Sequence, residues 1–156
     1  MAVAPQELRT FFVTSSTKDR RSIFQSARMA GLLIDVLQEN RNRKRYLLHE
    51  FVVMPDHFHL LLTPTADVSL EKAVQYIKGG FSFRARRELD FGATIWQESF
   101  TEHRIRDLDD YEQHRSYIRE NPVRRFLAQA PEGFPYSSAH SGLGIDPVPP
   151  WLKPPP

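Results

Sequence analysis

Two histidines separated by a single residue are the first side chains in this sequence whose types and spacing could do chemistry. His57 and His59 lie in the apolar stretch MPDHFHLLL, residues 54–62. Alternate residues of a β-strand point to the same side. Both imidazoles therefore share the face opposite Phe58, about 6–7 Å apart at the backbone. Two imidazoles at this separation can bind one divalent cation. The alternative is a pair of solvated histidines on an exposed strand.

Two histidines leave a divalent cation short of protein ligands, and a later segment offers further candidates. His114, Tyr117 and Asn121 are spaced i, i+3, i+7, which places them on one face of a helix. Asn121 offers a carbonyl oxygen to a hard cation. Tyr117 offers a phenol that can attack a phosphodiester when a metal polarises the phosphate. The alternatives are that Tyr117 is a core aromatic and that Asn121, which precedes Pro122, ends the helix.

The pattern of apolar residues predicts the elements that must position these groups. The predicted strands are 9–15, 46–54, 57–63 and 102–106, and the predicted helices are 23–40, 69–89 and 109–120. We expect the glycine pair at 79–80 to kink or divide the second helix, and Pro122 to disturb or end the third. The order is β-α-β-β-α-β plus a third helix. This is an α+β, ferredoxin-like fold with an antiparallel sheet and two helices on one face. The third helix, a partner subunit or a ligand covers the other face.

The composition indicates one globular domain. The chain has 156 residues, of which 40% are hydrophobic and 26% charged. We expect a folded domain over residues 1–140 and a flexible, proline-rich tail over residues 141–156. The absence of cysteine excludes a disulfide framework and thiolate metal sites, and it agrees with a cytoplasmic location. No apolar run approaches a membrane span, so we expect no membrane partner.

Five stretches of the sequence, taken in order, resemble the REP-associated tyrosine transposases of the single-tyrosine HUH superfamily, insertion-sequence-200 type. They are LHEFVVMPDHFHLLL, YIKGGFSFR, IWQESFTEHRIRD, YIRENPV and FPYSSA, and the similarity covers roughly residues 8–140. The resemblance implies a ferredoxin-like fold that cleaves single-stranded DNA and joins it through a 5′-phosphotyrosine. His57 and His59 match the metal-binding pair of the family, Tyr117 matches its nucleophile, and Asn121 matches the residue that completes the metal site.

The resemblance also implies a cofactor and partners. The cofactor is a divalent metal, Mg²⁺ or Mn²⁺, and two imidazoles suit manganese better than magnesium. The partner is single-stranded DNA with a hairpin of the REP kind, and the superfamily includes homodimers. The chain departs from the family where the usual NPVRAGL is replaced by NPVRRFL, with Arg125 and Phe126 in place of the small pair. This departure concerns local packing or DNA contacts beyond the catalytic helix.

Because the net charge is only +2, contacts with DNA must rest on local basic patches. Guanidinium groups bind phosphates well. The arginines that we expect to contact DNA are Arg84, Arg86, Arg87, Arg104, Arg106, Arg115, Arg119, Arg124 and Arg125. Phe81, Phe83 and Trp96 are candidate stacking surfaces for bases. Taken singly, each arginine could instead be a solvated charge and each aromatic a core residue.

Two other functions compete with the transposase interpretation. One is a descendant that recognises hairpin nucleic acid and no longer cuts it. The other is a metal-dependent phosphodiesterase that uses water, with Tyr117 in a structural role. The presence of His57, His59, Tyr117 and Asn121 together favours retained cleavage chemistry. A covalent protein–DNA adduct would separate the transposase from both alternatives.

Overall fold

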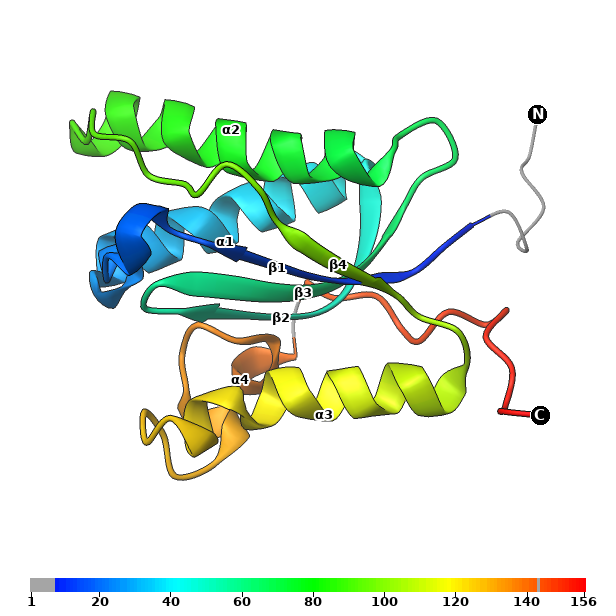
Figure 1. Cartoon of the computed structure of the whole chain (residues 1–156). Coiled ribbons are helices and arrows are strands. Elements are labelled where there is room, and N and C mark those ends of the chain that lie inside the picture. The colour runs from blue at the N-terminus through cyan, green and yellow to red at the C-terminus, as the bar shows by residue number, and fades with distance from the viewer. Residues whose placement is uncertain (1–7, 143) are drawn as a thin grey trace.

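The fold is a four-stranded antiparallel sheet between two layers of helices (Figure 1). The computed structural model describes residues 8–142 and 144–156. The strands, in the order β2-β3-β1-β4, are β1 (Phe11–Ser16), β2 (Tyr46–Met54), β3 (His57–Pro64) and β4 (Thr101–Arg104). The main helices are α1 (Ala27–Asn42), α2 (Leu70–Leu89), α3 (Leu108–Arg124) and the short α4 (Ser138–Ser141). This arrangement confirms the predicted α+β, ferredoxin-like fold.

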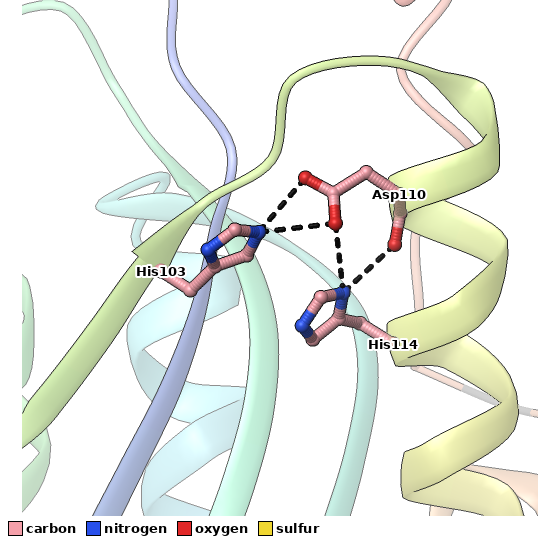
Figure 2. A group of neighbouring side chains, drawn as sticks. All are labelled: His103, Asp110 and His114. Carbon is pink, nitrogen blue, oxygen red and sulfur yellow. Dashed lines mark hydrogen bonds and ion pairs between the residues drawn. The ribbon is translucent and has the colours of Figure 1, made fainter. Parts of the chain in front are cut away.

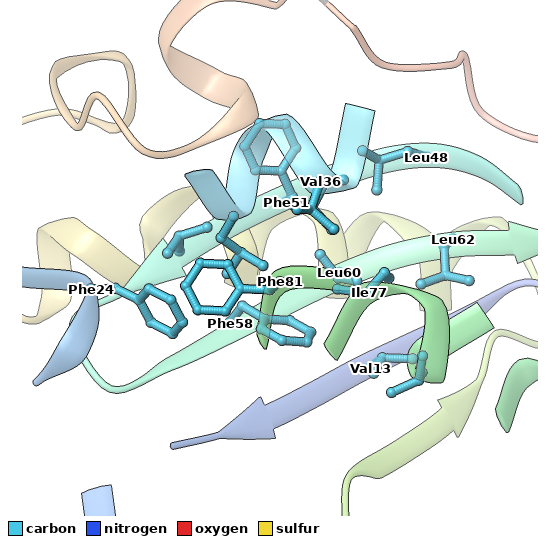
Figure 3. Close-up of a cluster of buried hydrophobic side chains, with 14 of the residues drawn as sticks. Val13, Phe24, Val36, Leu48, Phe51, Phe58, Leu60, Leu62, Ile77 and Phe81 are labelled. Atoms are coloured by element: carbon cyan, nitrogen blue, oxygen red, sulfur yellow. The ribbon is translucent and has the colours of Figure 1, made fainter. Parts of the chain in front are cut away.

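The two faces of the sheet are covered by different helices, as Figure 1 shows: α1 and α2 lie on one face, and α3 and α4 on the other. Phe58, Leu60 and Leu62 of β3 are fully buried in the main core against α1 and α2 (Figure 3). A second apolar cluster lies on the α3 face, formed by Val52, Met54, Leu61, Ile105, Tyr111, Ile118 and Phe134. The alternation predicted for β3 therefore holds. His57 and His59 are buried in the structure, so they are not solvated strand histidines.

A β-bulge in β2 turns two consecutive polar residues toward α3. Leu48 pairs with Leu62 and Glu50 pairs with Leu61, so His49 is an extra residue on this strand. The His49 ring lies near Tyr111, and Glu50 is within 3.2 Å of Arg119. Because these partners both belong to α3, the bulge places an imidazole and a carboxylate side by side beneath that helix.

The helices differ from the predictions at three places, and each difference has a physical cause. α1 begins at Ala27 rather than at residue 23, because Ser26 caps it by accepting from the Met29 N–H. α2 continues without a break through the glycine pair at 79–80, so the predicted kink is wrong. A Cβ added at Gly80 would lie 3.5 Å from Val36 of α1, so the pair lies where two helices pack closely.

α3 continues past Pro122 to Arg124, four residues beyond its predicted end. A proline removes one N–H from the helical ladder. The next N–H groups restore it, because Arg125 donates to the Asn121 carbonyl (3.1 Å) and Leu127 to the Pro122 carbonyl (2.8 Å). Asn121 is therefore held inside the helix and not at a frayed end.

The proline-rich C-terminal segment is extended and is attached to the domain. Asp146 accepts two hydrogen bonds from the Arg41 guanidinium (3.0 and 3.1 Å) and one from the Leu48 N–H (2.8 Å). The Lys153 carbonyl accepts from the N–H of Leu108, the first residue of α3. These contacts tie the segment that we expected to be flexible to α1, β2 and the start of α3. No helix in the described part of the chain is long and apolar enough to cross a membrane.

Candidate active site

The two histidines of β3 lie against each other beneath α3. Their ring centroids are 4.7 Å apart. His57 Nδ1 donates to the carboxylate of Asp56 (2.6 Å), and His59 Nδ1 shares a hydrogen bond with the hydroxyl of Thr14 on β1 (2.7 Å). Each ring is thus held through Nδ1, which leaves Nε2 for another partner. Sequence reasoning missed Asp56 and Thr14, although cross-strand pairing of Thr14 with His59 is the kind of contact a strand register determines.

Two buried polar atoms at this place lack a partner among the described residues. They are Nε2 of His59 and Oδ1 of Asn121. Buried polar atoms without a partner are rare in folded proteins, because each has lost its hydrogen bonds to water and no hydrogen bond within the protein compensates for that loss. A ring nitrogen and an amide oxygen are both donors to divalent cations. His57, His59 and Asn121 therefore fit a divalent metal ion.

Both histidines are neutral at neutral pH, as metal ligands must be. Burial and, to a smaller extent, the charges of His57, Arg125 and Arg124 together lower the pKa of His59 to about 3. Burial also lowers the pKa of His57, an effect that the Asp56 carboxylate opposes. The lone pair on each Nε2 is consequently available without competition from protons.

Tyr117 lies at the mouth of this site, one turn before Asn121 on α3. Its ring centroid is 5.3 Å from that of His59, edge to face. Its side chain is 38% exposed, so a strand of DNA can reach it. Tyr111, by contrast, is 2% exposed within the apolar cluster under α3, and burial raises the pKa of its phenol. The core-aromatic alternative thus describes Tyr111 and does not describe Tyr117.

A second cluster of possible metal ligands joins β4 to α3 (Figure 2). Ligand atoms of His103, Asp110 and His114 all lie within 4.8 Å of one another. These groups already satisfy each other: His103 Nε2 donates to the Asp110 carboxylate (2.8 Å), and His114 Nδ1 donates to the Asp110 carbonyl (2.8 Å). The Arg106 N–H also donates to this carboxylate. Sequence reasoning missed this cluster, for which the i, i+4 spacing of Asp110 and His114 was the available signal.

The ionisation of Asp110 agrees with a structural role for this second cluster, in which hydrogen bonds link β4 to α3. Burial opposes ionisation of Asp110, but hydrogen bonds from the Arg106 N–H and His103 outweigh it and lower the pKa of the carboxyl. The carboxylate therefore accepts from its neighbours across the neutral range. Of the two clusters, only the first has buried atoms without a partner in the described part of the chain, at His59 and Asn121, so these residues and His57 are the stronger candidates for a metal.

The structure brings two of the nine expected arginines to the histidine site. The Arg124 guanidinium lies over the Tyr117 ring, 4.4 Å from its centroid, and also donates to the Tyr117 carbonyl. Arg125 lies close enough for its charge to lower the pKa of His57 and His59. Positive charge next to the candidate nucleophile, Tyr117, and the candidate metal ligands favours a phosphate there.

The other seven arginines have different surroundings. Arg115 and Arg119 project from α3 onto the buried carboxylate of Glu50, at 3.6 and 3.2 Å. Arg84 pairs with Glu88 on α2, on the opposite side of the sheet from the site. The remaining four are exposed near the C-terminal ends of α2 and β4: Arg86, Arg87, Arg104 and Arg106. Their contact with DNA stays a prediction.

Two of the three expected stacking aromatics belong to the core. Phe81 is fully buried, and Trp96 packs against Phe24 and Phe58 with its indole N–H on the Lys78 carbonyl. Only Phe83 is exposed among the three, and it lies on α2. None of them lies on the face of the histidine site: Phe81 and Phe83 belong to α2, which covers the other face of the sheet, and Trp96 packs against the main core on that same face.

The fold and the site together define a class: a ferredoxin-like domain with a histidine pair on a central strand and an accessible tyrosine on a covering helix. Residues 8–121 match the family model described as "Transposase IS200 like", and the chain belongs to this family. It is 29% identical over 142 residues to the REP-associated tyrosine transposase of Escherichia coli (strain K12), covering 89% of this chain and 82% of that protein.

Further comparisons agree. A putative REP-associated tyrosine transposase of Haemophilus influenzae (strain ATCC 51907 / DSM 11121 / KW20 / Rd) is 35% identical over 98 residues, 56% of each protein. A solved structure of a REP-associated tyrosine transposase bound to a REP hairpin superposes with a TM-score of 0.68 at 28% identity, covering 94% of this chain and 86% of that one. A putative transposase from Deinococcus radiodurans shares the fold, with a TM-score of 0.53 at 24% identity over 72% of this chain and 88% of that one.

Proposed function

We propose that this protein is a metal-dependent single-stranded DNA endonuclease and strand transferase that acts at hairpin-associated sites through a 5′-phosphotyrosine intermediate. One observation carries the proposal. The accessible Tyr117 lies 5.3 Å, ring to ring, from a buried, neutral His59 whose Nε2 has no partner among the described residues. Family membership supports a transposase role, and the similar transposase solved with a REP hairpin supports hairpin DNA as the partner.

Each residue has a role in this mechanism. His57, His59 and Asn121 would hold Mn²⁺ or Mg²⁺, which supplies polarisation of the scissile phosphate when bound. The Tyr117 oxygen attacks the phosphorus, the bond from phosphorus to the 3′ oxygen breaks, and the phenol proton is transferred to that departing oxygen, which becomes a 3′-hydroxyl. The 5′ end of the DNA stays on the tyrosine. A different 3′-hydroxyl can reverse the step and join strands without ATP, because the phosphodiester energy is conserved.

One chain contains all the proposed groups. The Tyr117 ring of α3 contacts the His59 ring of β3 within one subunit, His57 lies beside His59, and Asn121 follows Tyr117 by one turn of the same helix. In this proposal the active site is therefore formed within one copy of the chain. The homodimer implied by the family resemblance stays a separate prediction about assembly.

The test is a search for the covalent intermediate. A single-stranded, hairpin-bearing oligonucleotide labelled at its 3′ end is incubated with the protein and MnCl₂, and the mixture is denatured and separated by electrophoresis. We expect a labelled protein adduct from the wild type and from Tyr111→Phe, and none from Tyr117→Phe. Tyr117→Phe keeps the ring, so the fold and DNA binding should be retained.

Two results would replace this proposal with one of the alternatives. Nicking by Tyr117→Phe at near the wild-type rate would mean that water attacks the phosphate. Binding of the hairpin by the wild type, without a nick or an adduct in Mn²⁺ or Mg²⁺, would mean a recognition protein that does not cut.

A further inference from the structure

The chain beyond the proposed nucleophile presents an apolar side chain in an unusual position. Phe126 is 95% exposed, the highest exposure of any large apolar residue in the described part of the chain. Its backbone has a φ of +60°, in the left-handed region. A side chain at such a φ brings Cβ close to the neighbouring carbonyl, whereas glycine has no Cβ and adopts this conformation at little cost. Phenylalanine therefore destabilises this turn, and because its side chain is exposed, no burial of apolar surface compensates for that cost.

The same turn is fixed against the candidate active site. The Phe126 N–H donates to the Val123 carbonyl (3.1 Å), and the Arg125 N–H donates to the carbonyl of Asn121 (3.1 Å). The Arg124 guanidinium covers the Tyr117 ring at 4.4 Å. Figure 1 shows this end of α3 on the same side of the molecule as the turn between β2 and β3, where His57 lies. The backbone of Phe126 is thus fixed by this turn, two residues after the arginine that covers Tyr117.

The charge around Phe126 indicates which kind of ligand contacts this surface. Arg124 and Arg125 directly precede it, and both are exposed. Unpaired nucleotides fit an exposed aromatic ring beside two arginines, because each nucleotide has a flat base that can stack on the ring and a phosphate that can pair with a guanidinium group. A basic pair is a poor surface for burial against a second copy of the same chain, because like charges would meet.

We propose that Phe126 stacks against an unpaired nucleobase of the strand whose phosphate lies at Tyr117, with Arg124 and Arg125 on the adjoining phosphates. This inference rests on the proposed function for the presence of DNA at the site, and adds a binding position for a base next to the cleaved bond. Base stacking on an aromatic residue tolerates any sequence, because every base has a π face. Phe126 would therefore hold the strand in place without reading its sequence.

The test uses a DNA hairpin with single-stranded thymidine arms in which one base at a time is 2-aminopurine, whose fluorescence is quenched on stacking. The protein carries Tyr117→Phe so that the strand stays intact. We expect quenching at one arm position. Phe126→Ala should abolish this quenching and weaken binding roughly tenfold, whereas Phe126→Trp should preserve both. The matched control is Phe83→Ala, which removes another exposed phenylalanine, 64% exposed on α2, and should change neither.

A second measurement separates stacking from a structural role. Phe126→Gly relieves the left-handed conformation, so its melting temperature should equal or exceed that of the parent while its DNA affinity falls. A lower melting temperature for both Phe126→Gly and Phe126→Ala would mean that Phe126 supports the fold, and would overturn the inference.

The remaining outcomes are also decisive. Unchanged affinity and quenching in Phe126→Ala, in a protein whose Tyr117 forms the covalent adduct, would overturn this inference and leave the proposed function intact. A loss of dimer in Phe126→Ala by light scattering, with DNA affinity retained, would assign Phe126 to a protein contact. Failure of the protein with intact Phe126 to bind the hairpin would count against both proposals.

Discussion

At the scale of single residues, the unpartnered oxygen of Asn121 makes the candidate metal site testable without any DNA. An unsatisfied buried acceptor costs about 1–3 kcal/mol. Asn121→Leu removes this acceptor, so the metal-free protein should become more stable by about 1 kcal/mol. The same change removes a ligand, so Mn²⁺ affinity should fall at least about tenfold. Urea denaturation and titration calorimetry measure the two effects.

Asn40 provides the matched control for this substitution. It is equally buried, but its amide donates to the Val36 carbonyl (2.9 Å) and accepts from Arg45 (2.6 Å). Asn40→Leu should therefore destabilise the protein and leave Mn²⁺ affinity unchanged. A loss of stability in Asn121→Leu similar to that in Asn40→Leu would show that the amide of Asn121 has a structural partner.

The main chemical groups could be predicted from the sequence because each depends on a local periodicity. Alternation along a strand places His57 and His59 together, and the helical repeat places Tyr117 above Asn121. The hydroxyl that holds His59 could not, because Thr14 is 45 residues from His59 in the chain. The clearest error at this scale is Phe81, a predicted stacking surface that lies in the main core. An aromatic residue on an amphipathic helix gives the same pattern in both roles.

At the scale of elements, a buried carboxylate holds α3 to the sheet. Glu50 of β2 accepts from Arg119 (3.2 Å) and from the Ser138 hydroxyl (2.8 Å), with Arg115 at 3.6 Å. Removing the cations from a buried ion pair leaves an uncompensated charge, which costs about 3–5 kcal/mol. We expect Arg115→Ala/Arg119→Ala to lower the free energy of unfolding by about 3 kcal/mol, as measured by urea denaturation at pH 7.

The control for this prediction is Arg125→Ala, because that side chain is exposed and contributes no ion pair among the described residues. Arg125→Ala should leave stability unchanged and weaken DNA binding. Stability equal to wild type in the double variant would indicate that Arg115 and Arg119 serve the DNA surface, as expected from the sequence, and not the attachment of α3.

The extent of the helices shows why single residues are poor guides to where an element ends. By intrinsic propensity, a glycine or a proline in the interior of a helix destabilises that helix. In α2 the pair Gly79–Gly80 lies where α1 packs, so tertiary contact outweighs the local preference. In α3, Pro122 is buried beside Asn121, and the last turn closes with other N–H groups. Packing against a distant element therefore explains the first case, and burial with local hydrogen bonds explains the second.

At the scale of the whole molecule, the sheet is covered on both faces, and the C-terminal segment completes the covering on the α3 side (Figure 1). The order of strands and helices followed from the sequence, since each predicted strand and helix has a counterpart in the structure. The docking of residues 144–156 did not follow, because a proline-rich composition has no periodicity that predicts where it binds. Its attachment includes the carboxylate of Asp146, which meets Arg41 and Leu48, and the carbonyl of Lys153, which accepts from the Leu108 N–H.

The last prediction concerns that attachment and its dependence on pH. Burial opposes ionisation of Asp146, but Arg41 and the Leu48 N–H outweigh it and lower the pKa of the carboxyl below its usual 3.8. A carboxyl whose pKa is lower in the folded state binds fewer protons there than in the unfolded chain. Its contribution to stability is therefore complete above about pH 4 and is lost as the pH falls through the folded pKa. We expect Asp146→Asn to lower the free energy of unfolding by about 1–2 kcal/mol at pH 7.

The difference between wild type and Asp146→Asn should shrink as urea denaturation is repeated at pH values below about 4, because protonation removes the same charge from the wild type. Limited proteolysis at pH 7 should cut the variant within residues 144–156 faster than the wild type. Asp67→Asn is the control, since Asp67 is exposed and carries a long hydrogen bond of 3.4 Å from Thr65. A stability difference for Asp146→Asn that stays constant down to pH values well below 4 would mean that the amide disturbs packing, and that the ion pair with Arg41 is not what holds the segment.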